Sequence, residues 1–214
     1  MKYFQKVILV PICVMFVGCG STDTKTYDNS SGRSTIYEDV SSSSTSVQGI
    51  GVESQDIVSM TDEMMRDMLQ NPTLMNGVSA PRVIIDSQYM VNESTSRINK
   101  NMMTDRLRIN LNRASNGRLV FVGRHYSNMV NKEREMKRDG LVDAGTIRTT
   151  QATAGADFRL GGRITSLDAL DSNTQLKSRY HQVTFEMVDL ELGTIVWSGI
   201  YEFKKTAQDD IIYR

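Results

Sequence analysis

FRLGGRI, residues 158–164, decides the fold, because apolar and polar side chains alternate along it. A period of two is typical of a half-buried β-strand, in which successive side chains point to opposite faces of the sheet. The alternation returns over residues 183–190 and 195–201, and Leu-Gly-Thr at 192–194 separates these two runs. Short turns between alternating runs predict antiparallel hairpins, so we expect the last third of the chain to form a β-meander.

The residues before this meander show helix and strand patterns in turn. Apolar residues spaced three or four apart predict amphipathic helices, and short apolar runs predict buried strands. The helices are expected over residues 57–69 and 95–114, and the strands over 82–86 and 118–122. Pro72 ends the first helix, and Asn116-Gly117 ends the second.

A third helical pattern carries more charge than the first two. Its apolar stripe consists of Tyr126, Met129, Val130 and Met136. Gly140 stops the pattern, and residues 147–154 are expected to add one or two helical turns. Together the patterns predict one α/β domain: a mixed sheet with a β-α-β-α first half, an antiparallel meander at the C-terminus, and helices packed on the sheet.

Several residues in these elements have a structural explanation. Trp197 alternates with apolar residues, which predicts a core anchor in a central strand. Gly161-Gly162 predicts either a bulge or a close approach of another backbone. Six methionines at helical spacing are expected in the core, with a flexible partner-binding surface as the alternative. They are Met60, Met64, Met65, Met68, Met102 and Met103.

The N-terminus has the layout of a secretory signal peptide. Lys2 and Lys6 precede an apolar run over residues 7–17 that is too short to span a bilayer. A glycine and then Cys19 follow, which is the order of a bacterial lipobox. We therefore expect residues 1–18 to be removed and Cys19 to carry several acyl chains, palmitate among them, as a stable membrane anchor. An ordinary signal peptide with an incidental cysteine is the alternative.

The mature chain is close to neutral and has one cysteine. Loss of Lys2 and Lys6 from the 25 basic residues leaves 23 against 25 acidic ones, so no basic field attracts nucleic acid. With Cys13 removed, only Cys19 remains, which excludes an intrachain disulfide and a cysteine metal site. The second mature residue is Gly20 rather than Asp, a pattern associated with sorting to the outer membrane.

Residues 19–52 link the expected anchor to the domain, which we assign to residues 53–214. The link is rich in Ser, Thr, Gly and Asp, with four consecutive serines at 41–44. Such a segment cannot bury enough apolar surface to offset its ordering entropy, so a disordered tether is expected. The tether is either a passive spacer or a segment whose length places the domain at a particular depth in the cell wall.

The chain offers few groups for catalysis. His125 and His181 have no histidine or cysteine at metal-ligand spacing, and both are expected to be surface or helix-start residues. Asp168 and Asp171 could serve a glycan hydrolase, but a solvated hairpin is favoured. Neither a nucleophile elbow nor a P-loop occurs. We therefore expect no catalytic residue, no metal and no cofactor.

Four runs of the domain carry a family resemblance through their order and spacing. They are VIIDS at 83–87, LVFV at 119–122, ADFRLGG at 156–162 and GTIVWSG at 193–199. With the lipobox and the tether, they make residues 55–204 resemble the family of penicillin-binding-protein activators named for LpoB. A similar sheet occurs in the secretion lipoprotein CsgG and in the N-terminal domain of TolB, so the resemblance implies a TolB-like fold.

The resemblance also implies a function. It implies an outer-membrane lipoprotein without enzymatic activity that faces the periplasm, reaches through the peptidoglycan and stimulates a class A penicillin-binding protein. The best-known members have a Pro-rich tether, whereas proline occurs here only at Pro11, Pro72 and Pro81. A CsgG-like secretion-pore subunit is the alternative, and an enzyme is a third possibility. Because contacts usually come from loops and helix faces, residues 126–139 and 167–180 are the candidate contact segments.

Overall fold

The structure is a computed structural model, and it describes residues 40, 49–75, 77, 79–142, 152–171 and 176–207. These residues belong to one compact unit, Glu38–Arg214. The predicted signal peptide, Cys19 and most of the predicted tether lie outside the described residues. Most of the segment 147–154 also lies outside them, and its described residues 152–154 are not helical, which corrects that part of the prediction.

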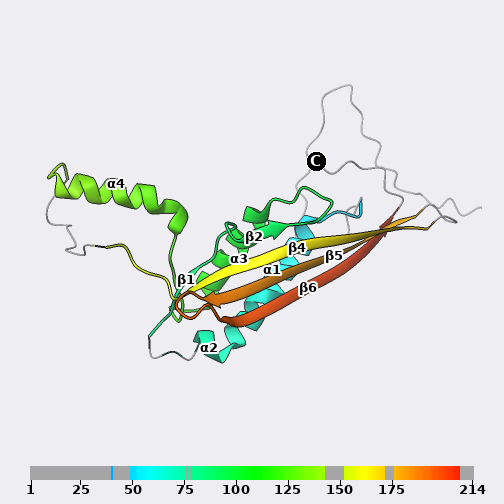
Figure 1. The fold of residues 1–214 in the computed structure, drawn as a ribbon, viewed down its shortest axis with the longest axis horizontal. Coiled ribbons are helices and arrows are strands. Elements are labelled where there is room, and N and C mark those ends of the chain that lie inside the picture. Colours follow the sequence, from blue (N-terminus) through cyan, green and yellow to red (C-terminus); the bar gives the residue numbers. More distant parts are fainter. Residues whose placement is uncertain are drawn as a thin grey trace, which may run out of the picture. The chain divides into compact units, whose positions relative to one another are not determined.

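A six-stranded mixed sheet runs through the domain (Figure 1). Its strands are β1 (Arg82–Ile84), β2 (Met90–Asn92), β3 (Val120–Phe121), β4 (Phe158–Leu170), β5 (Lys177–Asp189) and β6 (Ile195–Ala207). The order is β3-β1-β4-β5-β6, and β2 also pairs with β4. The hairpins β4-β5 and β5-β6 are antiparallel, whereas β1 and β2 run parallel to β4. The predicted mixed α/β sheet with a C-terminal meander is confirmed.

The three meander strands are longer than the alternating runs that predicted them. Each has 13 residues, and β4 and β5 stay paired along their whole length. Their pairing continues beyond the last apolar inward residue, where Asp168 lies directly opposite Arg179. An ion pair therefore takes the place of apolar contacts at this end of the hairpin, and a pattern of apolar residues could not predict it.

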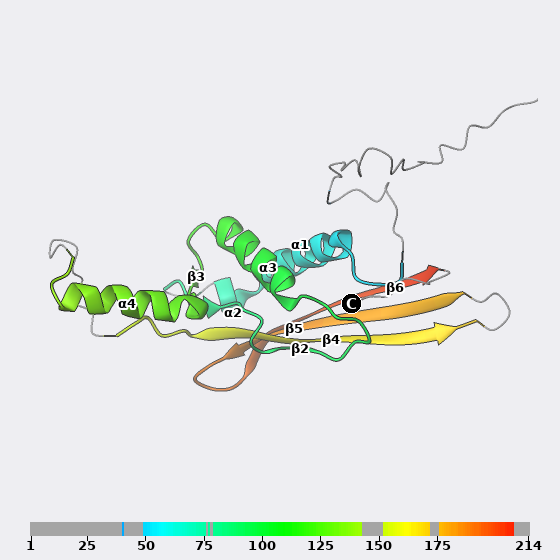
Figure 2. The same ribbon diagram turned by 90° about the horizontal axis from the view of Figure 1, so that it is seen from above.

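Within the described residues, four helices and a 3-10 turn accompany the sheet. They are α1 (Ser54–Gln70), α2 (Pro72–Met75), α3 (Lys100–Ala114), η1 (Arg124–Tyr126) and α4 (Ser127–Arg138). A capping box between Glu53 and Asp56 starts α1. Pro72 follows the end of α1 as predicted and opens α2, where a missing N–H is tolerated. Figure 2 shows α1 and α3 on the same side of the sheet.

The core lies between this side of the sheet and the two long helices. Its buried cluster includes Met60, Met64, Met68, Met103, Leu107, Leu111, Leu160, Ile164, Val183, Phe185, Met187 and Trp197. The inward faces predicted for residues 158–164 and 183–190 are therefore confirmed. Trp197 is a core residue as predicted, with 6% of its surface exposed. Its strand β6, however, is at the edge of the sheet order, so the prediction of a central strand is wrong.

The Gly161-Gly162 pair marks a close approach and not a bulge. Gly162 pairs with Phe185 in the continuous ladder between β4 and β5. A Cβ atom on Gly162 would lie 2.3 Å from the backbone oxygen of Thr184 and 2.7 Å from Met90 Sδ. Packing of β2 and β5 around this position therefore requires a residue without a side chain.

The helix predicted over 95–114 begins later than expected. It starts at Lys100, because the side chain of Asn99 accepts a hydrogen bond from a first-turn N–H and caps it there. Met102, which the helical spacing places on the apolar face, is 54% exposed. The buried stripe passes instead through its neighbour Met103. Adjacent helix positions point about 100° apart, so only one of the two can face the core.

The strand predicted over 118–122 is shorter and less buried than expected. Only Val120 and Phe121 pair with β1, and Val120 is 46% exposed. The helix predicted after it exists as α4, but none of its residues is buried. Met129 in the expected apolar stripe is 64% exposed. Amphipathic spacing therefore predicted the helix correctly. Its apolar face, however, is not buried against any other described part of the domain.

Candidate functional site

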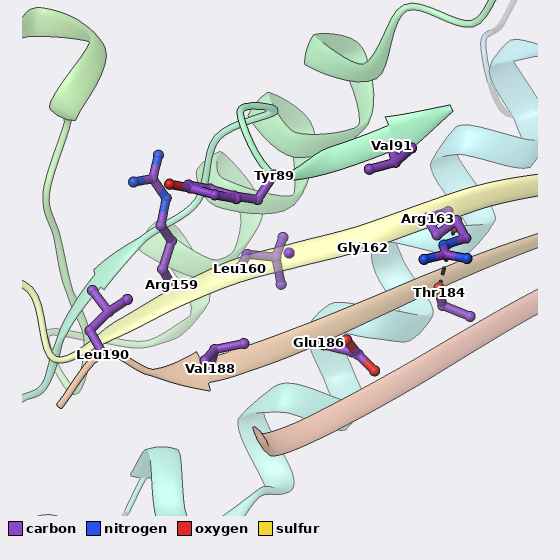
Figure 3. Close-up of a pocket in the computed structure, with 11 residues that line it drawn as sticks. Tyr89, Val91, Arg159, Leu160, Gly162, Arg163, Thr184, Glu186, Val188 and Leu190 are labelled. Carbon is purple, nitrogen blue, oxygen red and sulfur yellow. Dashed lines mark hydrogen bonds between the residues drawn. The ribbon is translucent and has the colours of Figure 1, made fainter. Parts of the chain in front are cut away.

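The side of the sheet away from α1 and α3 carries an open hollow of about 690 Å³ (Figure 3). Its lining from β4 and β5 includes Arg159, Gly161, Arg163, Thr184, Glu186 and Val188. Tyr89 and Val91 border it from the β2 side. Alternation along the strands turns these side chains away from the core. Gly161 has no side chain, so the hollow is deeper at this position of β4.

Arg159 is fixed at one end of the hollow by several partners. Its Nη2 donates hydrogen bonds to both carboxylate oxygens of Asp86, at 3.0 and 2.9 Å, and to Gln88 Oε1 at 2.6 Å. The guanidinium carbon lies 4.5 Å from the ring centroid of Tyr89, within cation–π range. Arg159 Nε is buried without a hydrogen-bond partner. These contacts hold the Tyr89 ring in place while 57% of that residue stays exposed.

The rest of the hollow mixes charge with apolar surface. Arg163 Nη1 lies 3.4 Å from Glu93 Oε2, and the side chains of both residues are about half exposed. Thr184 Oγ1 donates a hydrogen bond to the backbone oxygen of Arg163 at 3.3 Å, drawn as a dashed line in Figure 3. Val91 is 48% exposed beside them. The hollow therefore presents an aromatic ring, opposite charges and small apolar surfaces together.

This arrangement is suited to recognition. Among the described residues, its lining contains no serine, cysteine or histidine that could form a nucleophile and base pair. Across the described residues, no group of three or more His, Cys, Asp or Glu side chains could hold a metal ion. No described helix is both long enough and apolar enough to cross a membrane. A preorganised tyrosine and arginine are instead typical anchors of protein–protein contacts.

Asp168, considered above for glycan hydrolysis, forms an ion pair. Arg179 Nε and Nη2 donate to its two oxygens at 2.5 and 2.8 Å. The hydrogen bond from Arg179 lowers the pKa of Asp168 below its usual range. A general acid in a glycosidase needs a raised pKa, so this carboxylate is unsuited to that role. Asp171 follows the end of β4 and is exposed.

His181 is buried, which corrects the prediction of a surface or helix-start residue. It lies inside β5 on the same face as Val183, and none of its surface is exposed. Its Nε2 lies 2.9 Å from the backbone oxygen of Ile50. Burial lowers the pKa of His181 below its ordinary value. His125 lies in η1 and is exposed, as predicted.

The two predicted contact segments belong to other parts of the domain than the hollow. Residues 126–139 include all of α4, and 167–180 include the paired ends of β4 and β5. Leu167 and Leu170 in the second segment are 72% and 60% exposed. Neither segment contributes to the described lining of the hollow. Sequence reasoning missed the hollow because its residues come from separate strands, although alternation already marked Arg159 and Arg163 as outward.

A comparison with protein families identifies the fold and the general function. The family model described as the peptidoglycan-synthase activator LpoB matches residues 56–203, from α1 to β6. This chain belongs to the LpoB family. The predicted resemblance is confirmed, and the general function follows: LpoB is a family of activators of peptidoglycan synthesis, not a catalytic family. No curated protein matches the chain.

Solved structures of two LpoB domains and of another lipoprotein are similar to this chain at low identity. The LpoB C-terminal domain from Salmonella enterica is 20% identical, with 70% of this chain and 96% of that chain covered and a TM-score of 0.36. The LpoB C-terminal domain from Escherichia coli is 17% identical, with 67% and 94% covered and a TM-score of 0.38. Lipoprotein GNA1162 from Neisseria meningitidis is 16% identical, with 61% and 87% covered and a TM-score of 0.31.

Proposed function

We propose that this protein binds a class A penicillin-binding protein and stimulates its glycan polymerisation and cross-linking. The observation that carries the proposal is the match of residues 56–203 to the LpoB family of peptidoglycan-synthase activators. The domain acts in this proposal as a binding module and not as an enzyme. The lowered pKa of Asp168, which disfavours a role as general acid, supports that interpretation.

The proposed location is the periplasmic side of the outer membrane, with a lipid anchor on Cys19. The motif around Cys19 and the composition of residues 19–52 support this location. Fully extended, such a tether reaches on the order of 110 Å. Anchor and tether raise the effective concentration of the domain near an inner-membrane synthase, so a modest direct affinity suffices.

The hollow of Figure 3 is one proposed contact for the synthase. Tyr89 and Arg159 are residue types that dominate binding energy at protein interfaces, and here they hold each other in position. A side chain that is ordered before binding loses less entropy on association. Tyr89→Ala is therefore expected to weaken the synthase complex by about tenfold or more, mainly through faster dissociation.

The test uses the chain from residue 20 onward, without lipid, and the purified class A synthases of its host. We expect a saturable increase in the rate of glycan polymerisation and recovery of a synthase from detergent-solubilised membranes of the host. If none of the host synthases binds or responds at saturating concentration, the proposal is wrong. Recovery of a ring of copies together with a secretion substrate would favour the pore alternative.

A further inference from the structure

A second hollow, with a volume of about 740 Å³, lies along α4. Its basic lining residues are Arg82, Arg124, Arg134 and Lys137. None of its described lining residues carries a carboxylate. This single-sign lining differs from the hollow on the sheet, where Glu186 balances part of the positive charge. A groove lined by one sign of charge attracts a ligand of the opposite sign.

The groove follows one face of α4. Ser127, Val130, Arg134 and Lys137 line it from α4 at intervals of three or four residues, which is the spacing of one helical face. At 1.5 Å per residue this face extends over about 15 Å, the length of about five residues of extended chain. Residues 152–155, Ala-Thr-Ala-Gly, form the facing wall with small side chains.

The walls of the groove are apolar as well as cationic. Val122, Val130, Ala152 and Ala154 line it beside the basic residues. A small inorganic anion has no apolar surface to place against these walls. An extended peptide does, because its alternate side chains can point to the cationic face and to the apolar wall. Arginine also binds carboxylates through two parallel hydrogen bonds, which favours acidic side chains as its partners.

We infer that this groove binds a short acidic segment of a partner protein in extended conformation. Arg124 and Lys137 pair with carboxylates, and Val122 and Val130 contact the intervening apolar side chains. The inference rests on the proposed function in one respect, since the segment is assigned to the synthase. Lys137 already lies 3.6 Å from Glu133, but both side chains are partly exposed and such solvent-facing pairs contribute little. Lys137 can therefore leave Glu133 and pair with a carboxylate of the partner at little cost in free energy.

Two double variants of equal charge test the groove. Arg124→Gln with Lys137→Gln removes two basic groups from the lining. Lys132→Gln with Arg138→Gln removes two basic groups from α4 that do not line it. Lys132 and Lys137 are well matched, because each forms an ion pair with a glutamate of the same helix, at 3.8 and 3.6 Å. Both variants remove two positive charges from the domain, so they separate an effect of the groove from an effect of net charge.

The first measurement uses a fluorescein-labelled peptide that alternates Glu with Leu, and the full chain purified in neutral detergent. We expect the groove variant to weaken binding by about tenfold or more and the control variant by less than about twofold. A peptide with Gln in place of Glu should bind weakly to all forms, and salt should reduce binding of the acidic peptide. Equal weakening by both variants, or no binding of the acidic peptide, would overturn the inference.

The second measurement uses a purified host synthase and, separately, isolated peptidoglycan. If the wild-type chain binds the synthase but both variants bind it equally well, the groove inference fails and the proposed function stands. If the wild-type chain binds no synthase while the groove still selects the acidic peptide, the proposed function fails together with the assignment of the segment to the synthase, and the acidic-peptide groove stands. Selective loss of peptidoglycan binding by the groove variant, with synthase binding intact, would show that the ligand is the wall polymer and overturn the inference.

Discussion

His181 Nε2 lies 2.9 Å from the backbone oxygen of Ile50, and this hydrogen bond ties the middle of β5 to the segment that leads into α1. A carbonyl oxygen only accepts, so Nε2 carries the proton and the neutral ring leaves Nδ1 without one. That Nδ1 is buried and has no hydrogen-bond partner. Phe203 stacks on the ring at a centroid distance of 4.7 Å. The surroundings of His181 therefore favour the neutral imidazole over the protonated one.

Acidification should destabilise the domain through His181. Burial depresses its pKa from the ordinary value of about 6.5 and Arg179 and Lys205 add to the effect, whereas the hydrogen bond to Ile50 and the charge of Asp56 oppose it. Below about pH 6.5 the unfolded chain therefore binds a proton that the folded chain does not. This contribution to stability is complete above that pH and decreases as the pH falls, by at most about 1.4 kcal/mol per unit. Urea unfolding at a series of pH values measures it.

The two histidines provide a control for this pH dependence. His181→Gln keeps a donor for the Ile50 oxygen and removes the titration, so stability should change less between pH 7 and pH 5.5. His125→Gln alters only an exposed residue and should leave the wild-type profile in place. The explanation is contradicted if His181→Gln retains the full wild-type slope, or if His125→Gln removes it.

Trp197 joins the edge strand to the first helix. Its Nε1 donates a hydrogen bond to Asp67 Oδ2 at 2.7 Å, and its ring packs against Gly199. Trp197→Ala should lower the free energy of unfolding by about 3–5 kcal/mol, because a large buried ring is lost. Asp67→Ala removes the bond alone and should cost about 1 kcal/mol. Chemical denaturation of both variants checks this, and a loss under about 1 kcal/mol for Trp197→Ala would mean that the ring is not a core residue.

Gly162 and Gly161 should differ sharply in their tolerance of a methyl group. A Cβ on Gly162 would collide with backbone and with Met90, whereas the nearest atom to a Cβ on Gly161 is 3.6 Å away. Gly162→Ala is therefore expected to cost about 1–3 kcal/mol through strain between strands. Gly161→Ala should change stability by less than about 0.5 kcal/mol. Urea midpoints of the two variants test the prediction, and equal effects would contradict the described packing.

Cys19→Ala should release the protein from membranes and prevent normal signal processing, because the acyl acceptor is lost. Cys13→Ala is the matched control, since Cys13 lies in the apolar run that is removed from the mature chain. Fractionation and metabolic labelling with palmitate measure both effects. Membrane association of Cys19→Ala at the wild-type level would disprove the lipid anchor.

The alternating strands were predictable because burial on one face of a sheet imposes a period of two on the sequence. Phe158, Leu160 and Ile164 on β4 and Phe185 on β5 follow it without exception. Helix boundaries were less predictable where a side chain decided them, as Asn99 does for α3. The edge position of β6 could not be predicted from Trp197. Its apolar pattern indicates burial, and a side chain is buried equally well in a central strand and in an edge strand that a helix covers.

The sequence by itself determined the fold class and the family, because periodicity and the order of short motifs are properties of the chain. It also determined the candidate anchor at Cys19. Only the tertiary structure decided that His181 is buried and that Arg159 holds Tyr89 at an open hollow. It alone placed Arg124 and Lys137 along one groove. These features depend on which strand and helix faces meet, and a contact between residues far apart in the chain leaves no local periodic signal.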